Sequence, residues 1–346
     1  MEVRSGIYSL INLLVKPHFL FPRLIHAQVE PCNFCNLHCR MCMWEKIPVS
    51  KKTLGVSEFR RILTEIRPGY ITFSGYGEPL LNRNLEEMIR IAKRRGVVLN
   101  TTTNGLLLEE RCETLVRSGV DLVSVSLDAP NAELYRHIRN SDAFSQVLRG
   151  ISRFVEMRRR LHVQSKIRIS FVIQESNLDA ITSFLGLARE LRVDAVLFQL
   201  LEPFEVVIQE GLQGQMTEGQ LRGRLLDAYR VAQEMSIITN LRHLLRDLSL
   251  LWRTKYLDEE NDIPCKMIWF STMVSCHGEV RPCCFFACDP LSYGNLNEDS
   301  LDHILNGVGM RAFRGQLRAG RRPHPICRRC VPLRYRDILL PGYDRF

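Results

Sequence analysis

Hydrophobic and polar positions follow two alternating periods from about residue 23 to residue 202, and this alternation predicts the fold. Six short runs are apolar or β-branched and bounded by turn residues, as buried strands are. They are Leu24–Val29, Tyr70–Phe73, Val97–Thr101, Leu122–Leu127, Ile167–Ile173 and Ala195–Leu200. The runs between them have apolar residues at helical spacing. These are Val56–Ile66, Leu85–Arg95, Glu109–Arg117, Ala143–Arg158 and Leu178–Leu191.

Strand–helix units that follow one another in this way predict an α/β fold on parallel strands with right-handed crossovers. We expect a partial (β/α)6 barrel, with a doubly wound sheet as the alternative. In both folds ligands bind at the carboxyl ends of the strands, so polar residues there are candidates for a site. The next part of the chain reads as helical, most clearly at Leu221–Met235 and Leu241–Tyr256.

The pattern changes from Pro264 onward. Short β-like runs flank a His277-Gly278 turn, cysteines become frequent, and Leu301–Leu317 has helical spacing. We therefore expect three parts. They are an amphipathic extension at 1–22, the barrel with its following helices at 23–257, and a small cysteine-rich module at 258–346.

The apolar stretch Ile7–Val15 is the main feature of the N-terminal extension. It is far shorter than the roughly 20 residues that cross a bilayer. It also lacks the basic start and the cleavage site of a secretory signal. We expect a short amphipathic helix on a cytoplasmic protein, and peripheral membrane contact stays open as an alternative.

Charge and cysteine content narrow the classes of function. The chain of 346 residues has 47 Lys and Arg against 38 Asp and Glu, a net charge of +9. This excess favours an anionic partner, although a solvated basic surface is the simpler interpretation. The Arg-rich spots are not interleaved with aromatic residues, so nucleic acid is not favoured. Without a secretory signal, the 12 cysteines predict metal binding rather than disulfides.

Three cysteines follow the first predicted strand at C-x3-C-x2-C spacing: Cys35, Cys39 and Cys42. Three thiolates on one loop would bind three irons of a cubane cluster and leave the fourth iron open to another ligand. A zinc site is the alternative, with Cys32 or His38 as the fourth ligand.

This spacing, on a loop after the first strand, resembles the signature of the radical S-adenosylmethionine (SAM) superfamily. The resemblance covers roughly residues 20 to 205. It implies a [4Fe–4S] cluster whose open iron is chelated by the amino and carboxylate groups of SAM. It also implies that an electron from a flavodoxin- or ferredoxin-type reductant cleaves SAM to a 5′-deoxyadenosyl radical.

Two further segments resemble SAM-binding motifs of the family. Tyr76, Gly77, Glu78 and Pro79 follow the second predicted strand and resemble the GGEP motif, which binds the methionine amino group. Tyr76 stands where the family has its first glycine, which affects the expected backbone contact there. Asn104 ends the third strand in a T-N-G turn, for which an ordinary Asn-Gly turn is an equal alternative.

The fourth and fifth predicted strands also end in polar residues. Ser124, Ser126 and Asp128 share one face by period-two alternation and resemble the ribose-binding motif. Mutual hydrogen bonding within a capped turn is the alternative. Arg168 or Ser170 on the fifth strand is expected to contact the methionine carboxylate, and a structural salt bridge is an equal interpretation for Arg168.

A second cysteine set lies near the C-terminus: Cys265, Cys283, Cys327 and Cys330. Four thiolates are enough to close one cluster, and Gly278 permits a hairpin turn after the first of them. The C-x12-G-x4-C spacing resembles the SPASM module of the family, and its short continuation favours the twitch form with one auxiliary [4Fe–4S] cluster. Structural zinc is the alternative.

The other cysteines are expected to play lesser roles. A second auxiliary cluster built from Cys276, Cys284 and Cys288 is a minor alternative, because cubanes usually need four thiolates. Cys32 and Cys112 are expected to be ordinary thiols.

The resemblance implies a radical SAM oxidoreductase. We favour two-electron oxidation of a small polyol, sugar or cyclitol, with the auxiliary cluster as electron acceptor. The alternatives are a maturase that oxidises or crosslinks a ribosomal peptide or a protein, an RNA- or lipid-modifying enzyme, and an iron–sulfur electron carrier. Glu175 and Glu202, near strand ends, are candidates for the catalytic base, and solvent-facing carboxylates are the other interpretation.

Overall fold

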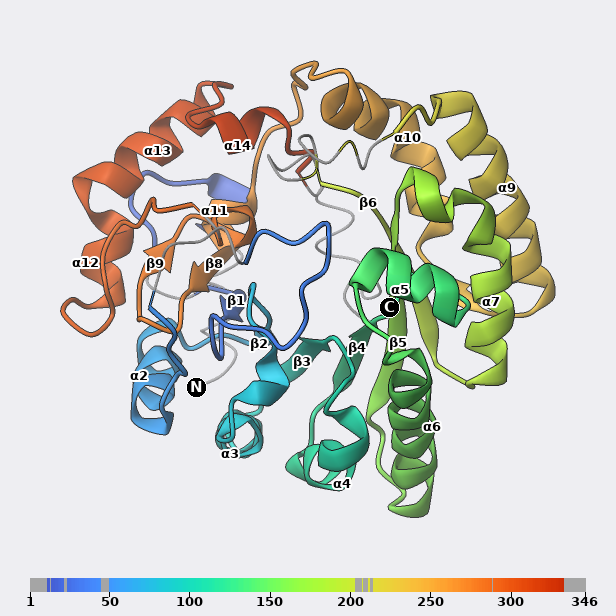
Figure 1. The fold of residues 1–346 in the computed structure, drawn as a ribbon. Helices are drawn as coiled ribbons and strands as arrows, with labels where there is room; N and C mark the ends of the chain where they lie inside the picture. The colour runs from blue at the N-terminus through green and yellow to red at the C-terminus, as the bar shows by residue number, and fades with distance from the viewer. Residues whose placement is uncertain are drawn as a thin grey trace. The chain divides into compact units, whose positions relative to one another are not determined.

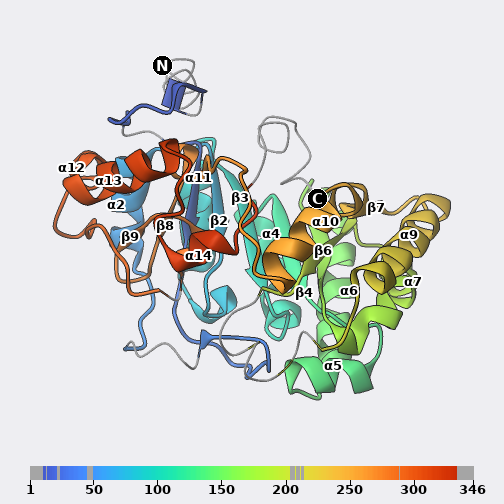
Figure 2. The same ribbon diagram turned by 90° about the horizontal axis from the view of Figure 1, so that it is seen from above.

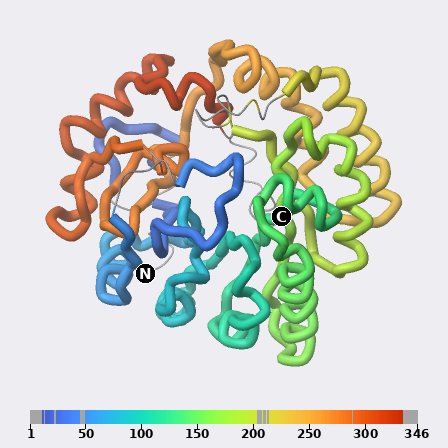
Figure 3. Tube along the Cα trace, viewed as in Figure 1, coloured from blue at the N-terminus to red at the C-terminus, as the bar shows by residue number. Residues whose placement is uncertain are grey.

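The computed structural model describes residues 11–12, 14–21, 24–44, 50–202, 207, 211, 214–287 and 289–332. The chain forms two compact units. Unit 1 comprises residues 1–35, 46–101 and 261–336, and unit 2 comprises residues 36–45, 102–260 and 337–346. Figure 3 follows the chain through them. No helix within the described ranges is both long and apolar enough to cross a membrane.

The sheet of unit 1 joins the first predicted strand to the C-terminal module. Its order is β3-β2-β1-β8-β9, from β3 (Val98–Thr103), β2 (Tyr70–Phe73), β1 (His26–Val29), β8 (Ser271–Val274) and β9 (Val280–Arg281). The last two residues of β3 belong to unit 2. The strands are parallel except for β9, which forms a hairpin with β8. Because Val29 is in register with Val274, the loop after β1 and the β8–β9 hairpin start at the same edge.

Helices α2 (Val56–Ile66) and α3 (Leu85–Lys93) pack side by side in unit 1 (Figures 1 and 2). The apolar side of α2 faces the sheet, where the rings of Phe59 and Phe73 lie 5.4 Å apart. The C-terminal part adds short helices. They are α11 (Met267–Phe270), η4 (Cys284–Phe286), α12 (Leu301–Asn306), α13 (Val308–Arg318) and α14 (Pro325–Arg328). The single helix predicted at 301–317 is two, because Gly307 is extended with ψ of 161°.

Unit 2 has its own parallel strands in the order β7-β6-β5-β4. They are β4 (Leu122–Ser126), β5 (Lys166–Ile173), β6 (Ala195–Leu200) and β7 (Ile238–Thr239). Ser126 is in register with Ser170, so the polar ends of β4 and β5 lie together as expected.

The helices of unit 2 follow its strands, as Figures 1 and 2 show. They are α4 (Leu108–Ser118), α5 (Ala132–Arg139), α6 (Phe144–Arg160), η3 (Glu175–Ala180), α7 (Ile181–Glu190), α9 (Glu218–Glu234) and α10 (Leu241–Tyr256). α4 packs on α6, and α9 packs on both α7 and α10. The helix predicted from Leu178 begins one turn earlier as the 3-10 helix η3.

The predicted α/β class with parallel strands is confirmed, and all six predicted strands are present within two residues of their expected bounds. The sequence pattern did not predict α5, which has only eight residues and is shorter than the window in which helical periodicity is read. Residues 11–12 and 14–15 of the predicted N-terminal helix are helical, and the other residues of Ile7–Val15 lie outside the described residues.

Candidate functional site

The loop after β1 is held against the segment after β2 within unit 1. The Cys32 thiol donates a hydrogen bond to the Glu78 carbonyl at 3.0 Å, and the Glu78 amide donates to the Phe34 carbonyl at 2.9 Å. Gly77 lies at the same contact, where an added Cβ would be 2.1 Å from the Cys32 carbonyl oxygen. Only glycine permits so close an approach of two backbones. Gly77 therefore fixes the loop directly before Cys35.

The Tyr76–Pro79 segment also makes internal contacts that the sequence did not predict. The Tyr76 amide donates to the Glu30 carboxylate at 3.3 Å, and the expected backbone contact of Tyr76 with SAM stays a prediction. Glu78 is 2% exposed. Its Oε1 accepts from the Leu80 amide at 3.0 Å and caps the 3-10 helix η2 (Pro79–Leu81). The contact of Glu78 with the methionine amino group stays a prediction.

Cys32 and His38, the candidates for the fourth ligand of a zinc site, both have protein partners. The Cys32 thiol is fully buried and donates to the Glu78 carbonyl at 3.0 Å. His38 packs on Trp44, with ring centroids 5.6 Å apart. Within the described ranges, no three His, Cys, Asp or Glu side chains form a group that could hold a metal ion. A cubane needs only one thiolate per iron, and the partly exposed thiols of Cys35, Cys39 and Cys42 match that donor set.

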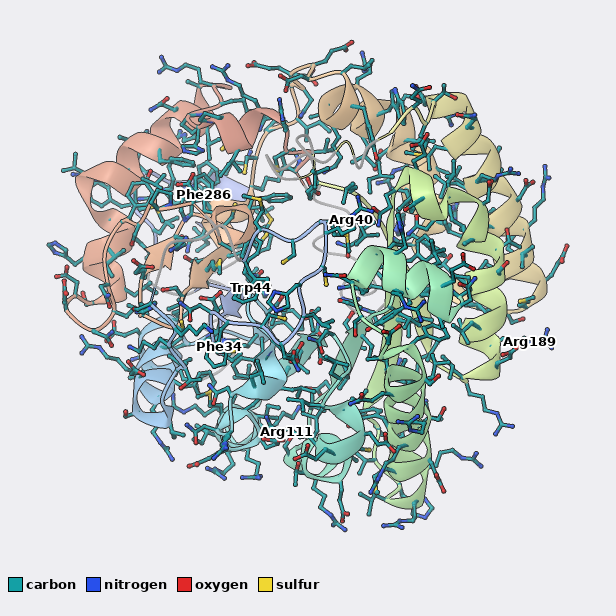
Figure 4. The ribbon with its side chains drawn as sticks, in the orientation of Figure 1. Phe34, Arg40, Trp44, Arg111, Arg189 and Phe286 are labelled. Carbon is teal, nitrogen blue, oxygen red and sulfur yellow. The ribbon has the colours of Figure 1, made fainter. Side chains whose placement is uncertain are left out.

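Cys39 and Cys42 lie in unit 2 on a tight turn, in which the Cys42 amide donates to the Cys39 carbonyl at 3.0 Å. The turn rests on α5. The Arg40 amide donates to the Ile138 carbonyl at 3.3 Å, and Nη1 of Arg40 lies 3.3 Å from Nε2 of His137. Figure 4 shows Arg40 beside α5. This helix therefore supports the part of the loop that carries two of the three predicted ligands.

The same loop has an apolar side. Met41 and Met43 pack against Leu201 and Val207, which are buried beyond the end of β6. Flexible thioethers fill such irregular gaps well. This packing excludes water from one side of the turn that carries Cys39 and Cys42.

Polar side chains at the ends of β4 and β5 pair with their own neighbours. Ser124 Oγ accepts from Arg168 Nε at 2.9 Å, and Ser170 Oγ donates to the Val125 carbonyl at 3.5 Å. Ser124, Arg168 and Ser170 are buried, whereas Ser126 is half-buried. Ser124 thus has a protein partner on the neighbouring strand, and the ribose contact of this motif stays a prediction. Ser126 is the member of the motif that is most accessible to a ligand.

Asn104 makes the ordinary turn contact and also reaches the cysteine loop. Its Oδ1 accepts from the Leu106 amide at 3.0 Å, which is the Asn-Gly turn given as the alternative. Its Nδ2 donates to Asn36 Oδ1 at 2.8 Å. Asn104 thus helps to position the residues that precede Cys39.

Asp128 lies beyond the end of β4 and departs from the predicted alternation, because its φ of 61° turns it into the left-handed region. Its carboxylate is fully buried. Oδ1 accepts from the Val172 amide at 2.8 Å, and Oδ2 forms an ion pair with Arg139. Burial raises the pKa of the Asp128 carboxyl, and the Arg139 guanidinium opposes this shift. The geometry thus gives Asp128 protein partners where the sequence predicts a ribose contact.

The sequence analysis did not single out Arg139. Its Nη1 donates to the sulfur of Cys39 at 3.6 Å, so it contacts a predicted cluster ligand directly. Asn131, which caps α5, and the basic residues in the last turn of this helix were signals for its presence. Nothing in the sequence indicates which residues Arg139 contacts.

Both candidates for the catalytic base have protein partners. Glu175 accepts from the Gln215 amide at 3.0 Å. Glu202 forms an ion pair with Lys255, whose side chain is 6% exposed. Structural roles account for both carboxylates, and neither is distinguished as a base by its contacts.

The four C-terminal cysteines of the predicted auxiliary site line one pocket of unit 1: Cys265, Cys283, Cys327 and Cys330. Cys283 interacts electrostatically with Cys265 and Cys330, and Cys327 interacts with Cys265. Burial raises the pKa of Cys265, and it raises the pKa of Cys327 to about 12. A hydrogen bond with Cys284, together with burial, holds the pKa of Cys283 well above its usual range. Metal binding would remove these protons.

Hydrogen bonds connect the segments that carry the first and last of these cysteines. Arg322 Nη2 donates to Asn261 Oδ1 at 2.7 Å and to the Ile263 carbonyl at 2.8 Å. Asn261 Nδ2 donates to the Cys330 carbonyl at 2.9 Å. The predicted turn at Gly278 is present, with φ of 87°. The four cysteines thus line one pocket and match the donor set of a cluster with four protein ligands, and their ligation of such a cluster stays a prediction.

The other cysteines of the module lie outside this set. Cys276 is fully buried, and its amide donates to the Glu30 carboxylate at 3.4 Å. Cys284 hydrogen-bonds Cys283 but does not line the pocket. Cys288 lies outside the described residues. The apolar lining includes Phe286, labelled in Figure 4.

Two regions of the chain match known protein families, one over the barrel strands and one over the cysteine-rich module. The profile of the radical SAM superfamily matches residues 29–185. The profile of SPASM, an iron–sulfur cluster-binding domain, matches residues 265–331. A radical SAM domain implies a [4Fe–4S] cluster and SAM, and a SPASM domain implies auxiliary iron–sulfur clusters.

Curated relatives are matched over part of their length. GTP 3′,8-cyclase of Chlorobaculum tepidum is 31% identical over 209 residues, which cover 59% of this chain and 62% of the relative. The antilisterial bacteriocin subtilosin biosynthesis protein AlbA of Bacillus subtilis is 23% identical over 292 residues, which cover 83% of this chain and 60% of AlbA. The chain thus spans about three fifths of the length of these relatives.

Solved structures share the fold. SuiB of Streptococcus suis bound to the precursor peptide SuiA superposes with a TM-score of 0.66 at 16% identity, over 89% of this chain and 70% of SuiB. Native anSMEcpe with bound AdoMet and the Cp18Cys peptide superposes with a TM-score of 0.63 at 17% identity, over 86% of this chain and 84% of anSMEcpe. The ordered cysteine sets, the parallel strands and both profile matches agree. Residues 29–185 form a radical SAM domain, and residues 265–331 form a C-terminal SPASM-type iron–sulfur module.

Proposed function

We propose that this chain is a radical SAM enzyme that oxidises or crosslinks a side chain of a peptide or protein. One observation carries the proposal: the similarity to AlbA, a protein of bacteriocin biosynthesis, covers 83% of the chain. A match of 292 residues necessarily extends from the barrel strands into the cysteine-rich module. The match to the GTP cyclase covers less of the chain, 59%. The proposal therefore takes the maturase alternative in place of the small-polyol oxidation.

Cys35, Cys39 and Cys42 would hold the first cluster, at which SAM binds. This group supplies the one-electron cleavage of SAM and hence the hydrogen abstraction that starts the reaction. Gly77 fixes the backbone before Cys35, and α5 supports the turn that carries Cys39 and Cys42. These contacts hold the thiolates in place without movement of the loop.

Cys265, Cys283, Cys327 and Cys330 would hold the auxiliary cluster. Four protein thiolates leave no open iron, so this group supplies an electron acceptor rather than a substrate-binding metal. Arg322 and Asn261 keep the first and last ligand segments together. Hydrogen abstraction removes one electron from the substrate, and a two-electron oxidation requires such an acceptor for the second.

The test is substrate-dependent formation of 5′-deoxyadenosine. The anaerobically reconstituted chain, with dithionite and SAM, is incubated with short peptides encoded beside its gene and, separately, with a panel of sugars and aminocyclitols. The proposal expects a peptide to increase 5′-deoxyadenosine formation and to lose two hydrogens by mass spectrometry. Stimulation by a polyol alone, with conversion of an alcohol to a ketone, would contradict it.

Cysteine variants test the first cluster. Replacing Cys35, Cys39 or Cys42 by Ala should abolish 5′-deoxyadenosine formation. Cys112→Ser is the matched control, because Cys112 is buried in α4 and outside both ligand sets. Reconstitution should yield about eight irons per chain if both sites hold cubanes. About four irons with one zinc would exclude the two-cluster interpretation.

A further inference from the structure

Arg139 is a buried cation whose position is fixed by α5. The Asn131 side chain caps the start of this helix by accepting from the Leu134 amide at 2.9 Å. Asn140 ends it in the left-handed region, with φ of 52°. Arg139, in the last turn, is 8% exposed. Because a guanidinium does not lose its proton in proteins, a full positive charge is held in the interior of unit 2.

Asp128 orients this guanidinium. The ion pair uses Nη2 of Arg139, which leaves Nη1 to donate to the sulfur of Cys39 at 3.6 Å. Asp128 is itself fixed, because its Oδ1 accepts from the Val172 amide at 2.8 Å and its carbonyl accepts from Asn177 Nδ2 at 3.1 Å. The ion pair is therefore a dipole held rigidly, with its positive end at Cys39.

The ion pair of Arg139 and Asp128 is buried, so water screens its charges little. The Tyr135 side chain is fully buried, and its hydroxyl group interacts with Arg139, Asp128 and Cys39. The Arg40 guanidinium, on the other side of the turn, lies against His137. In a buried environment of low dielectric constant, a fixed charge and a charge-assisted hydrogen bond have larger effects than at the surface.

We infer that Arg139 donates a hydrogen bond to the Cys39 thiolate at the first cluster and thereby raises the reduction potential of that cluster, with Asp128 as its positioning partner. The inference rests on the proposed function, because it takes Cys39 as a cluster ligand. Reduction adds one negative charge to the cluster and its thiolates. A fixed N–H donor and a positive charge at one sulfur stabilise the reduced state more than the oxidised state.

The test is a redox titration of the reconstituted chain, monitored by EPR. The first cluster is identified as the one whose EPR signal changes when SAM is added. Arg139→Gln removes the charge, and Arg139→Lys keeps it without the fork that contacts both Asp128 and Cys39. At a fixed potential, Arg139→Gln should lower the ratio of reduced to oxidised first cluster at least tenfold. This change corresponds to about 59 mV for a one-electron couple. Arg139→Lys should give a smaller shift in the same direction.

Arg136→Gln is the matched control. Arg136 lies one turn earlier on α5 and also pairs with an aspartate, Asp142, but both side chains are well exposed at 63% and 76%. Its replacement should leave the potential unchanged. The auxiliary cluster of each variant is an internal reference, and its potential should not move.

The outcomes separate the inference from the proposed function. A wild-type chain without a SAM-responsive EPR signal overturns both. A wild-type chain with the signal, and a potential that Arg139→Gln leaves unchanged, overturns the inference alone. If Arg139→Gln holds no iron at the first site, Arg139→Lys decides, because it keeps the charge without the fork that contacts both Asp128 and Cys39. The inference requires the potential of Arg139→Lys to fall, and a rise or no change refutes it.

Discussion

Replacing Gly77 by Ala tests whether the contact between two backbone segments positions the first cysteine ligand. The added Cβ would lie 2.1 Å from the carbonyl oxygen of Cys32, 2.6 Å from its carbonyl carbon and 2.8 Å from the Phe34 amide nitrogen. All three are backbone atoms, so no side chain can rotate to make room. The loop before Cys35 and the segment after β2 must move apart.

The cost follows from this contact. Overpacking at a close-packed position costs about 1–3 kcal/mol. Two hydrogen bonds cross the same contact, from the Cys32 thiol to the Glu78 carbonyl and from the Glu78 amide to the Phe34 carbonyl. Their net worth is about 0.5–1.5 kcal/mol each. We therefore expect Gly77→Ala to lower the free energy of unfolding by about 2–6 kcal/mol.

Gly186→Ala is the matched control. Gly186 lies within α7, and an added Cβ there meets nothing within 4 Å. Alanine in a helix interior is more stable than glycine by roughly 0.5–1 kcal/mol. The same substitution should thus lower the free energy of unfolding at Gly77 and raise it at Gly186.

The first assay is urea unfolding of the reduced, iron-free chain, monitored by circular dichroism. The second is the iron content of the chain after reconstitution. Gly77→Ala should unfold at lower urea and lose about four of the eight irons, whereas the auxiliary cluster stays. Gly186→Ala should keep all of its iron. An unchanged urea midpoint together with full iron content in Gly77→Ala would refute the reasoning.

Two further predictions concern His26 and the auxiliary site. The ring of His26 contacts Ser271 Oγ at 2.7 Å and Thr72 Oγ1 at 3.0 Å, and burial lowers its pKa to about 4. Below pH 6.5 the unfolded chain therefore binds a proton that the folded chain does not, so the free energy of unfolding should fall by about 3 kcal/mol between pH 6.5 and pH 4. Urea titrations should show a smaller loss for His26→Gln, and an equal loss in both chains would contradict this origin. Cys327→Ser should lose about four irons but still form 5′-deoxyadenosine. The control Cys112→Ser should keep its full iron content and its 5′-deoxyadenosine formation. Full iron content in Cys327→Ser would exclude Cys327 as a cluster ligand.

Local sequence patterns were sufficient to predict the strands and to identify the two cysteine sets. Apolar runs such as Tyr70–Phe73 and Ala195–Leu200 have the observed bounds, because short apolar or β-branched runs bounded by turn residues are typical of strands. The spacing of Cys35, Cys39 and Cys42 restricts the chemistry, because three thiolates on a short loop suit few metal groups. The turn at Gly278 was predictable because few residues other than glycine adopt a positive φ readily.

The helix α5 shows where local pattern is insufficient. It has eight residues, four of them charged or histidine, and is shorter than the roughly 11 to 18 residues over which helical periodicity is usually read. Its stability comes from tertiary packing, with Tyr135 and Ile138 buried. Short helices depend on such packing because nucleation is costly in isolation.

The sequence by itself determined the parallel α/β architecture and the two cysteine sets, since both depend on residue types at short spacing. The tertiary structure decided the partners of the polar residues. Alternation placed Asp128 on the face of Ser124 and Ser126, but the strand ends at Ser126 and a positive φ turns Asp128 toward Arg139. The contact of Arg139 with Cys39 joins residues 100 positions apart in the chain. Burial pairs such charges by proximity in space, and no local spacing encodes that proximity.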